Sequence, residues 1–390
     1  MTRSLARDAS LSAVVAGFVA TLVGYTSSAA IVFEAARALG AQEADVASWM
    51  IALGLGMGAL CIVLSLRYRE PIVAAWSTPG AALLATSSAG VPYGEAIGAF
   101  VVCGGLLAAV GFSGSVDRLM RHLPAPLAAA MLAGVLLRFG VGAFASLGTD
   151  FTLAFAMTAT YVAARRWFPR YAVPAALCVG VAVAATQGAI ATSQLSLTPV
   201  APVFTLPAWS WPAIAGLALP LFVVTMASQN VPGLATLRAA QYTAPAGPLV
   251  GWTGATTVAL APFGGFAFNL AAITAALCMG AEAHPDRARR YVAAVAAGVF
   301  YLVLGVLGGA VGALLTAVPR ALVLVVAGLA LVPTIASAMA TAVRDEDERE
   351  AAVVTFLVTA SGLTLAGIGA AFWGLVAGIV VRIVLHARRR

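Results

Sequence analysis

A run of uncharged polar side chains, Ser228-Gln229-Asn230, interrupts a long apolar stretch of the sequence. Amide groups are costly to bury without hydrogen-bond partners, so these side chains either bond to a neighbouring helix or bind a ligand. Their chemistry suits hydrogen bonding to a small polar molecule and supplies no nucleophile with a base beside it. We therefore predict that Gln229 and Asn230 bind a ligand, with a hydroxyl donor at Ser228.

Two other stretches carry proline and glycine where a membrane helix would otherwise continue. They read Trp76-Ser77-Thr78-Pro79-Gly80 and Pro262-Phe263-Gly264-Gly265-Phe266. Such residues break the hydrogen-bond ladder of a helix, and non-helical backbone at membrane depth is tolerated only where it is buried in protein or lines a cavity. We predict two half-helices whose unpaired N–H groups meet near mid-membrane and bind an anion. A simple kink in each helix is the alternative.

Aromatic side chains near these breaks complete the predicted site. Apolar walls with a few convergent polar groups are typical of small-molecule sites, although ordinary packing explains each aromatic residue equally well. The full set of predicted substrate-binding residues is Tyr25, Ser77, Thr78, Gly80, Ser228, Gln229, Asn230, Phe263, Gly264, Gly265, Phe266, Phe268 and Asn269.

Ionisable residues inside predicted spans are functional candidates by default. Glu34 is the candidate for carrying a proton; the alternatives are that it reaches the membrane surface, or that the substrate crosses with its own proton. Arg138 is the candidate for a gate, where it would pair with an oxygen or attract anions. The acidic run 344–350 lacks the glycine turn of a calcium loop, and the four cysteines stand singly. No metal or cofactor is predicted.

The elements that must position these residues are membrane helices. The chain has 390 residues, 62% of them hydrophobic and 9% charged, and a helix needs about 20 apolar residues to cross a bilayer. The apolar runs are uniformly apolar, unlike the alternating segments of membrane barrels. An all-α fold with fourteen transmembrane segments follows: 11–37, 44–66, 72–89, 92–112, 124–146, 149–168, 171–191, 210–238, 246–261, 264–280, 288–316, 319–342, 350–366 and 368–386.

The arginines support this count and predict an orientation. Most of them fall in alternate loops, whereas the other loops hold only Arg37 and Arg320. Loops rich in basic residues stay in the cytoplasm, so both termini are predicted to be cytoplasmic, in a bacterial inner membrane. The first span is expected to be retained. The net charge of +7 is dispersed along the chain, which argues against a nucleic-acid partner.

A proline-rich stretch at 192–212 divides the chain into two sets of seven segments. An odd number in each half means that the halves are inserted in opposite directions, as in inverted-repeat transporters. The predicted repeats are residues 1–191 and 213–390. Segments 3 and 10, which contain the two breaks, occupy matching positions in them.

At these motifs the chain resembles the benzoate/proton symporter family, BenE, over nearly its full length. The stretches that carry the resemblance are Ser228 to Ala235, Trp76 to Gly80 and Pro262 to Asn269. The layout is more distantly similar to nucleobase transporters and sulfate permeases. By that resemblance, a core (11–112 and 213–316) and a gate (124–191 and 319–386) enclose the substrate between the two half-helices, and the protein pairs through its gate as a possible homodimer.

The resemblance also implies a substrate. Nucleobase carriers place carboxylates on segments 8 and 10, but here Gln229 and Gly265 or its neighbours occupy those positions, which suits an anion better. We predict a secondary transporter of benzoate or a related aromatic carboxylate, coupled to protons and working by alternating access. Another small anion, a nucleobase and an anion channel remain alternatives. A membrane enzyme is disfavoured because the sequence contains no HExxH, GxSxG or P-loop motif.

Overall fold

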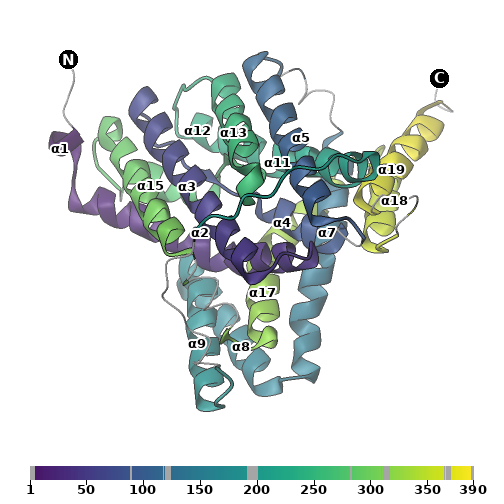
Figure 1. Cartoon of the computed structure of the whole chain (residues 1–390), viewed down its shortest axis with the longest axis horizontal. Coiled ribbons are helices and arrows are strands. Elements are labelled where there is room, and N and C mark those ends of the chain that lie inside the picture. The colour runs from purple at the N-terminus through teal and green to yellow at the C-terminus, as the bar shows by residue number, and fades with distance from the viewer. Residues whose placement is uncertain are drawn as a thin grey trace.

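The computed structural model describes residues 5–87, 90–116, 118, 124–190, 201–281, 283–308, 310, 317–363, 365 and 370–387. Within these residues the chain is almost entirely helical, and each of the fourteen predicted segments contains a helix (Figure 1). Seven of the described helices are long and apolar enough to cross a membrane by themselves. The protein is therefore helical and of the multi-pass membrane type.

The first half of the chain forms long helices separated by short turns. Side chains cap two of them: the Ser10 hydroxyl accepts from the Ala13 N–H at 3.2 Å, and an Asp150 carboxylate oxygen accepts from the Leu153 N–H at 3.2 Å. The elements are α1 (Leu5–Asp8), α2 (Leu11–Ala38), α3 (Glu43–Tyr68), β1 (Ala74–Ala75), α4 (Thr78–Ser87), α5 (Tyr93–Phe112), α7 (Ala125–Ala145), η1 (Ser146–Gly148), α8 (Phe151–Trp167), η2 (Pro169–Tyr171) and α9 (Ala172–Thr186).

The second half begins with one continuous helix that contains two π-helical turns. Each π turn ends two residues before a proline, Pro220 or Pro232, because a proline removes one donor from the helical ladder. The elements are α10 (Trp211–Ala213), η4 (Ile214–Ala218), α11 (Leu219–Thr225), η5 (Met226–Asn230), α12 (Val231–Ala239), α13 (Ala246–Leu260), η6 (Ala261–Phe263), β2 (Asn269–Leu270), α14 (Ile273–Met279), η7 (Arg287–Arg289), α15 (Tyr291–Val306), α17 (Arg320–Ala342), α18 (Arg349–Ala360) and α19 (Ala370–Ala387).

Two extended segments from opposite halves of the chain meet in a short antiparallel ladder. Ala74 of β1 lies opposite Leu270 of β2, and Ala75 lies opposite Asn269. The Ala271 N–H also donates to the Val73 carbonyl at 2.9 Å. The helix after each strand is short: α4 has ten residues and α14 has seven. The non-helical stretches adjoin the predicted motifs: residues 71–77 lead into α4, which contains Thr78 to Gly80, and residues 264–272 lead into α14. The strands within these two stretches lie side by side.

The second break is longer than expected, because α14 begins at Ile273 and not near residue 264. Gly264 adopts a left-handed conformation with φ +90, which ends η6, and the chain then runs extended to β2. The Thr257 hydroxyl accepts from the Phe268 N–H at 3.0 Å and so supplies a partner that a helix would have supplied. Local sequence does not specify such a contact between segments.

Glycines allow the long helices to pack closely. A Cβ added to Gly54 of α3 would lie 2.4 Å from the Cα of Gly305 in α15, and one added to Gly111 of α5 would lie 2.2 Å from the backbone N of Gly251 in α13. Small residues at such crossings bring helix backbones together in membranes. The pairs α3/α15, α5/α13 and α7/α17 are the most extensive helix contacts of the described chain.

Residues 201–210 do not hang free between the two halves but run as extended chain over the ends of other helices. The Ala208 N–H donates to the Gly94 carbonyl and the Thr205 N–H to the Pro262 carbonyl, both at 2.8 Å. Trp209 and Trp211 are exposed at the end of this stretch, as expected for tryptophans at headgroup level. The preceding part of the predicted linker, 192–200, lies outside the described residues.

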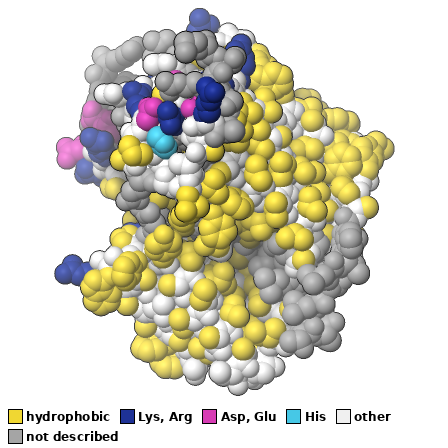
Figure 2. Space-filling view, turned by 90° about the vertical axis from the view of Figure 1, so that its left-hand side faces the viewer, with side chains coloured by type: hydrophobic (Ala, Val, Ile, Leu, Met, Phe, Trp, Pro, Cys, Tyr) yellow, Lys and Arg dark blue, Asp and Glu magenta, His cyan; other side chains and the backbone are white. Residues whose placement is uncertain are grey.

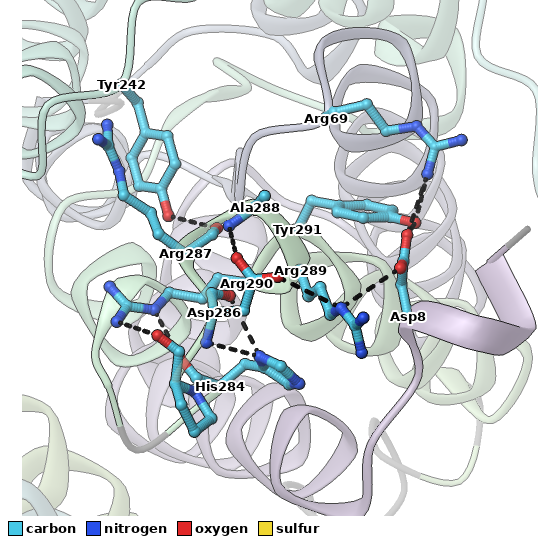
Figure 3. Close-up of polar contacts among 11 residues, drawn as sticks. Asp8, Arg69, Tyr242, His284, Asp286, Arg287, Ala288, Arg289, Arg290 and Tyr291 are labelled. Atoms are coloured by element: carbon cyan, nitrogen blue, oxygen red, sulfur yellow. Dashed lines mark hydrogen bonds and ion pairs between the residues drawn. The ribbon is translucent and has the colours of Figure 1, made fainter. Parts of the chain in front are cut away.

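A cluster of charged side chains joins the ends of α1, α3 and α15 (Figure 3). The Asp8 carboxylate is buried, accepts from the Tyr291 hydroxyl at 2.9 Å, and lies 3.6 Å from both Arg69 and Arg289. Arg69 also donates to the Tyr291 hydroxyl. In Figure 2 the charged side chains gather at one end of the face in view, and hydrophobic side chains cover most of the rest.

Candidate functional site

A cavity of about 520 Å³ lies between two groups of helices. One side is formed by α2, β1, α4, η5, the first turn of α12, the start of α14, and α15, and the other by α7 and α17. Its surface is mainly apolar, with uncharged polar groups contributed by residues Ser28, Thr78, Ser228, Gln229, Thr274, Tyr301, Thr334, Ser337 and Thr341. Such a volume and lining are typical of small-molecule sites.

The polar run of the eighth segment forms the π-helical turn η5. The Val231 N–H donates to the carbonyl of Met226, five residues back, and π turns of this kind are frequent at functional sites. Pro232 follows and has no N–H. The carbonyl of Ser228 therefore has no α-helical donor, and the carbonyl of Ala227 has none in the π register. Both residues line the cavity.

The two amides of η5 point to different places. Gln229 lines the cavity and is half-buried. Asn230 is fully buried, and its Oδ1 accepts from the Leu270 N–H of β2 at 3.0 Å. The Ser228 hydroxyl donates to the carbonyl of Val224 at 2.6 Å. Gln229 is thus placed to touch a ligand, whereas Asn230 holds the strand beside it.

Ser77 caps the start of α4. Its hydroxyl accepts from the Gly80 N–H at 3.1 Å, and its carbonyl accepts from the Ala81 N–H at 2.8 Å. Pro79 has no N–H. The described residues supply no acceptor for the remaining donor of this turn, the Thr78 N–H. Thr78 lines the cavity.

The start of α14 offers further donors. The Ala276 N–H donates to the Ala272 carbonyl at 3.0 Å, but the described residues supply no backbone acceptor for the N–H groups of Ile273, Thr274 and Ala275. Ala272, Ile273 and Thr274 line the cavity. The two breaks therefore bring backbone donors from opposite halves of the chain to one space.

Trp76 forms part of the cavity wall and is fixed from behind. Its indole N–H donates to the Ser28 hydroxyl at 2.9 Å, and the Tyr25 ring packs edge-on against it with centroids 5.1 Å apart. The Tyr25 hydroxyl is buried and has no hydrogen-bond partner among the described residues. Tyr25 therefore supports the wall and does not line the cavity.

Comparison with known proteins identifies the family of this chain. Residues 7–384 match the benzoate membrane transport protein family, BenE. The chain belongs to the BenE family. It is 37% identical over 385 residues to the benzoate membrane transport protein of Acinetobacter baylyi, covering 99% of this chain and 98% of that protein. It is 50% identical over 371 residues to the inner membrane protein YdcO of Escherichia coli, covering 95% of both.

Solved structures of anion transporters share the fold of this BenE-family chain. The overall structure of SLC26A9 superposes with a TM-score of 0.63 at 12% identity and covers 96% of this chain and 66% of that one. The transmembrane domain of the cyanobacterial bicarbonate transporter BicA gives 0.54 at 11% identity, covering 95% and 97%. At such identities the likeness concerns the fold alone.

The structure brings only part of the predicted site of this BenE-family protein to the cavity. Thr78, Ser228 and Gln229 line it. Four other predicted residues do not line it: Ser77 and Gly80 at the start of α4, Asn230 of η5 and Asn269 of β2. Asn269 is buried, donates to the Ala267 carbonyl at 3.0 Å, and leaves its Oδ1 without a partner among the described residues.

The predicted aromatic walls lie elsewhere. Phe266 packs against Trp49 and Phe100 with centroids 5.4 and 5.7 Å apart. Phe263 packs edge-on against a neighbouring phenylalanine, Phe204, at 5.7 Å. The same stretch contains Gly264, Gly265 and Phe268. None of the five predicted residues from this stretch lines the cavity. Glu34 on α2 and the exposed Arg138 on α7 are also absent from its lining.

Several lining residues were not among the sequence predictions. Ser28, Thr274 and Tyr301 come from α2, α14 and α15. The helix α17 adds three hydroxyls, Thr334, Ser337 and Thr341, spaced three and four residues apart. That spacing places them on one face of a helix and is the sequence signal that could have revealed them.

Proposed function

We propose that this BenE-family protein is a secondary transporter of benzoate or a related aromatic carboxylate, working by alternating access and coupled to protons. The observation that carries the proposal is the cavity between the two backbone breaks on one side and α7 and α17 on the other, where apolar walls meet a few uncharged polar groups. The name of the 37% identical relative supports an aromatic acid as the substrate.

The shape and chemistry of the cavity suit such a molecule. Its volume of about 520 Å³ is ample for one aromatic ring with a carboxyl group. Met57, Trp76, Leu132 and Leu331 supply apolar surface for the ring. The backbone donors at Thr78 and at the start of α14, together with Gln229, are available to the carboxyl oxygens. We assign the substrate contacts to Thr78, Ser228 and Gln229, with the other predicted residues behind them.

We further propose that the fold is a seven-plus-seven inverted repeat of residues 1–191 and 213–390. Helix contacts support it, since exchanging the two repeats converts the pair α3/α15 into α13/α5, and the pair α8/α9 into α18/α19, all of which pack together. The pairs β1/β2 and α7/α17 map onto themselves. The core is then 11–112 with 213–316, the gate is 124–191 with 319–386, and the cavity lies between them.

We propose that both termini are cytoplasmic and that the cavity faces the cytoplasm in this structure. The arginine distribution supports the orientation. The cavity lining reaches Ala125 at the start of α7 and Thr341 at the end of α17, and both residues are exposed. On this orientation those two helix ends are cytoplasmic. A homodimer through the gate is the assembly that we expect.

Uptake of labelled benzoate into proteoliposomes, with and without an inward proton gradient, tests the proposal. We expect saturable uptake that the gradient stimulates, and a Gln229→Ala variant with weaker apparent affinity. Gln187→Ala, which changes an exposed glutamine at the end of α9, is the matched control. Ohmic current would favour a channel. Uptake of another small anion or of a nucleobase, without uptake of any aromatic acid, would show that the proposed substrate is wrong.

A further inference from the structure

The cavity presents hydrogen-bond acceptors as well as donors. Pro232 removes the α-helical donor of the Ser228 carbonyl and the π-helical donor of the Ala227 carbonyl, and both residues line the cavity. The Gln229 side chain adds an amide oxygen beside its NH₂ group. A carboxylate has only acceptor oxygens, so it can use none of these acceptors and is repelled by each of them. A carboxylic acid has one O–H donor and one carbonyl acceptor, and it uses both kinds of group.

The groups around the cavity are uncharged at neutral pH. Every described residue of the lining is neutral, and the titratable one is the Tyr301 phenol on α15. Behind it lie Tyr25 on α2, Cys61 on α3 and Cys278 on α14. The charged residues on the surrounding helices all lie outside the lining: Glu34 and Arg37 on α2, Glu43, Asp45 and Arg67 on α3, Arg138 on α7, Arg238 on α12 and Arg320 on α17.

Burial of an ion without a counter-ion is far more costly than burial of a neutral group with hydrogen bonds. The neutral acid still bonds to the backbone donors, because its carbonyl oxygen accepts from the Thr78 N–H or from an N–H group in the first turn of α14. Its O–H donates to a freed carbonyl of η5 or to the Gln229 oxygen. A primary amide such as Gln229 pairs with a carboxylic acid through two parallel hydrogen bonds, one in each direction.

We propose that the site binds the aromatic acid in its protonated, uncharged form, so that the coupled proton crosses on the carboxyl group of the substrate. This inference rests on the proposed function of the same site. The protein then needs no titratable side chain as proton carrier, and coupling follows from selection of the neutral form. Affinity expressed as total acid falls about tenfold for each pH unit above the pKa of the acid.

Binding of three probes to the purified full-length protein, measured by titration calorimetry, tests the inference. Benzoate is the reference, benzamide is an uncharged analogue with one donor group and one acceptor group, and benzenesulfonate stays charged at every accessible pH. We expect benzamide to bind with the same affinity at every pH from about 5 to about 8. A carboxylic acid is largely ionised over this range, whereas benzamide stays neutral. We expect benzenesulfonate not to bind, and benzoate to take up about one proton per molecule bound.

Two results would overturn the inference while leaving the transporter intact. One is binding of benzenesulfonate as tight as that of benzoate, with no binding of benzamide. The other is benzoate binding without proton uptake at neutral pH. Failure of benzoate to bind at any pH would instead overturn the proposed function. As a check on the site, Gln229→Ala should weaken benzamide and benzoate alike, about two- to tenfold, whereas Gln187→Ala should change neither.

Binding of a second acid shows whether the proton is carried by the substrate or by a side chain of the protein. We compare benzoic acid with an aromatic acid whose pKa is about one unit lower. The plot of affinity against pH for the second acid should have the same shape and lie about one pH unit lower than that for benzoic acid. A titratable group on the protein would give both acids the same midpoint, and that result would also refute the inference.

Discussion

The neighbouring amides of η5 give the sharpest test of the site, because the structure assigns them opposite roles. Asn230 is fully buried and accepts from the Leu270 N–H, which is itself buried. Asn230→Ala leaves that N–H without an acceptor, which costs about 1–3 kcal/mol of stability. On the proposed function, Gln229→Ala removes at least one hydrogen bond to the ligand; the loss of one, about 0.5–1.5 kcal/mol, is a two- to tenfold loss of affinity.

Thermal unfolding in detergent, followed by intrinsic tryptophan fluorescence, and benzoate titration separate these effects. We expect Asn230→Ala to melt several degrees lower than the parent, and Gln229→Ala to melt with the parent but bind weakly. Asn269→Ala is the matched control, because the Asn269 Oδ1 has no described partner and its Nδ2 bonds only to its own loop. A stable Asn230→Ala variant beside an unstable Gln229→Ala variant would refute the assignment.

Four further substitutions test the packing and the ion pairs of Asp8. Gly264→Ala should abolish the folded peak in size-exclusion chromatography, because Gly264 has φ +90 and a Cβ would lie 1.8 Å from Trp49. Gly54→Leu should do the same by forcing α3 from α15, whereas Gly105→Leu should be tolerated because nothing lies within 4 Å of an added Cβ. Asp8→Asn should lower the free energy of unfolding by about 1 kcal/mol and the melting temperature slightly, since its two arginine partners are partly exposed. High salt should remove the difference.

The helical segments were predictable because each is an apolar run long enough to be recognised. The start of α4 was equally clear, since Pro79 is favoured in a first helical turn and Ser77 is a good cap. The start of α14 was not, because the extended chain after Gly264 is held by Trp49 and Thr257 from other segments. Partners far away in sequence decide where such a helix begins.

The predicted site residues divide in the same way. The positions of Thr78, Ser228 and Gln229 in the cavity lining were predictable because polar groups in an apolar run are conspicuous. Sequence could not separate Gln229 from Asn230, since the π turn decides which of them faces the cavity. The phenylalanines after Pro262 were assigned to the site by proximity in sequence, but the extended chain carries Phe266 to Trp49. The spacing of the α17 hydroxyls indicates that they share one face of a helix, but only tertiary packing decides that this face meets the cavity.

The ladder between β1 and β2 has a mechanical consequence. Its hydrogen bonds join the backbone breaks of both halves into one unit, and the Asn230 amide fastens η5 to the same unit. The cavity-lining backbone groups of the two breaks are thereby held at fixed distances from one another. For the alternating access that we propose, we expect this unit to move as one body relative to α7 and α17, together with the bound molecule.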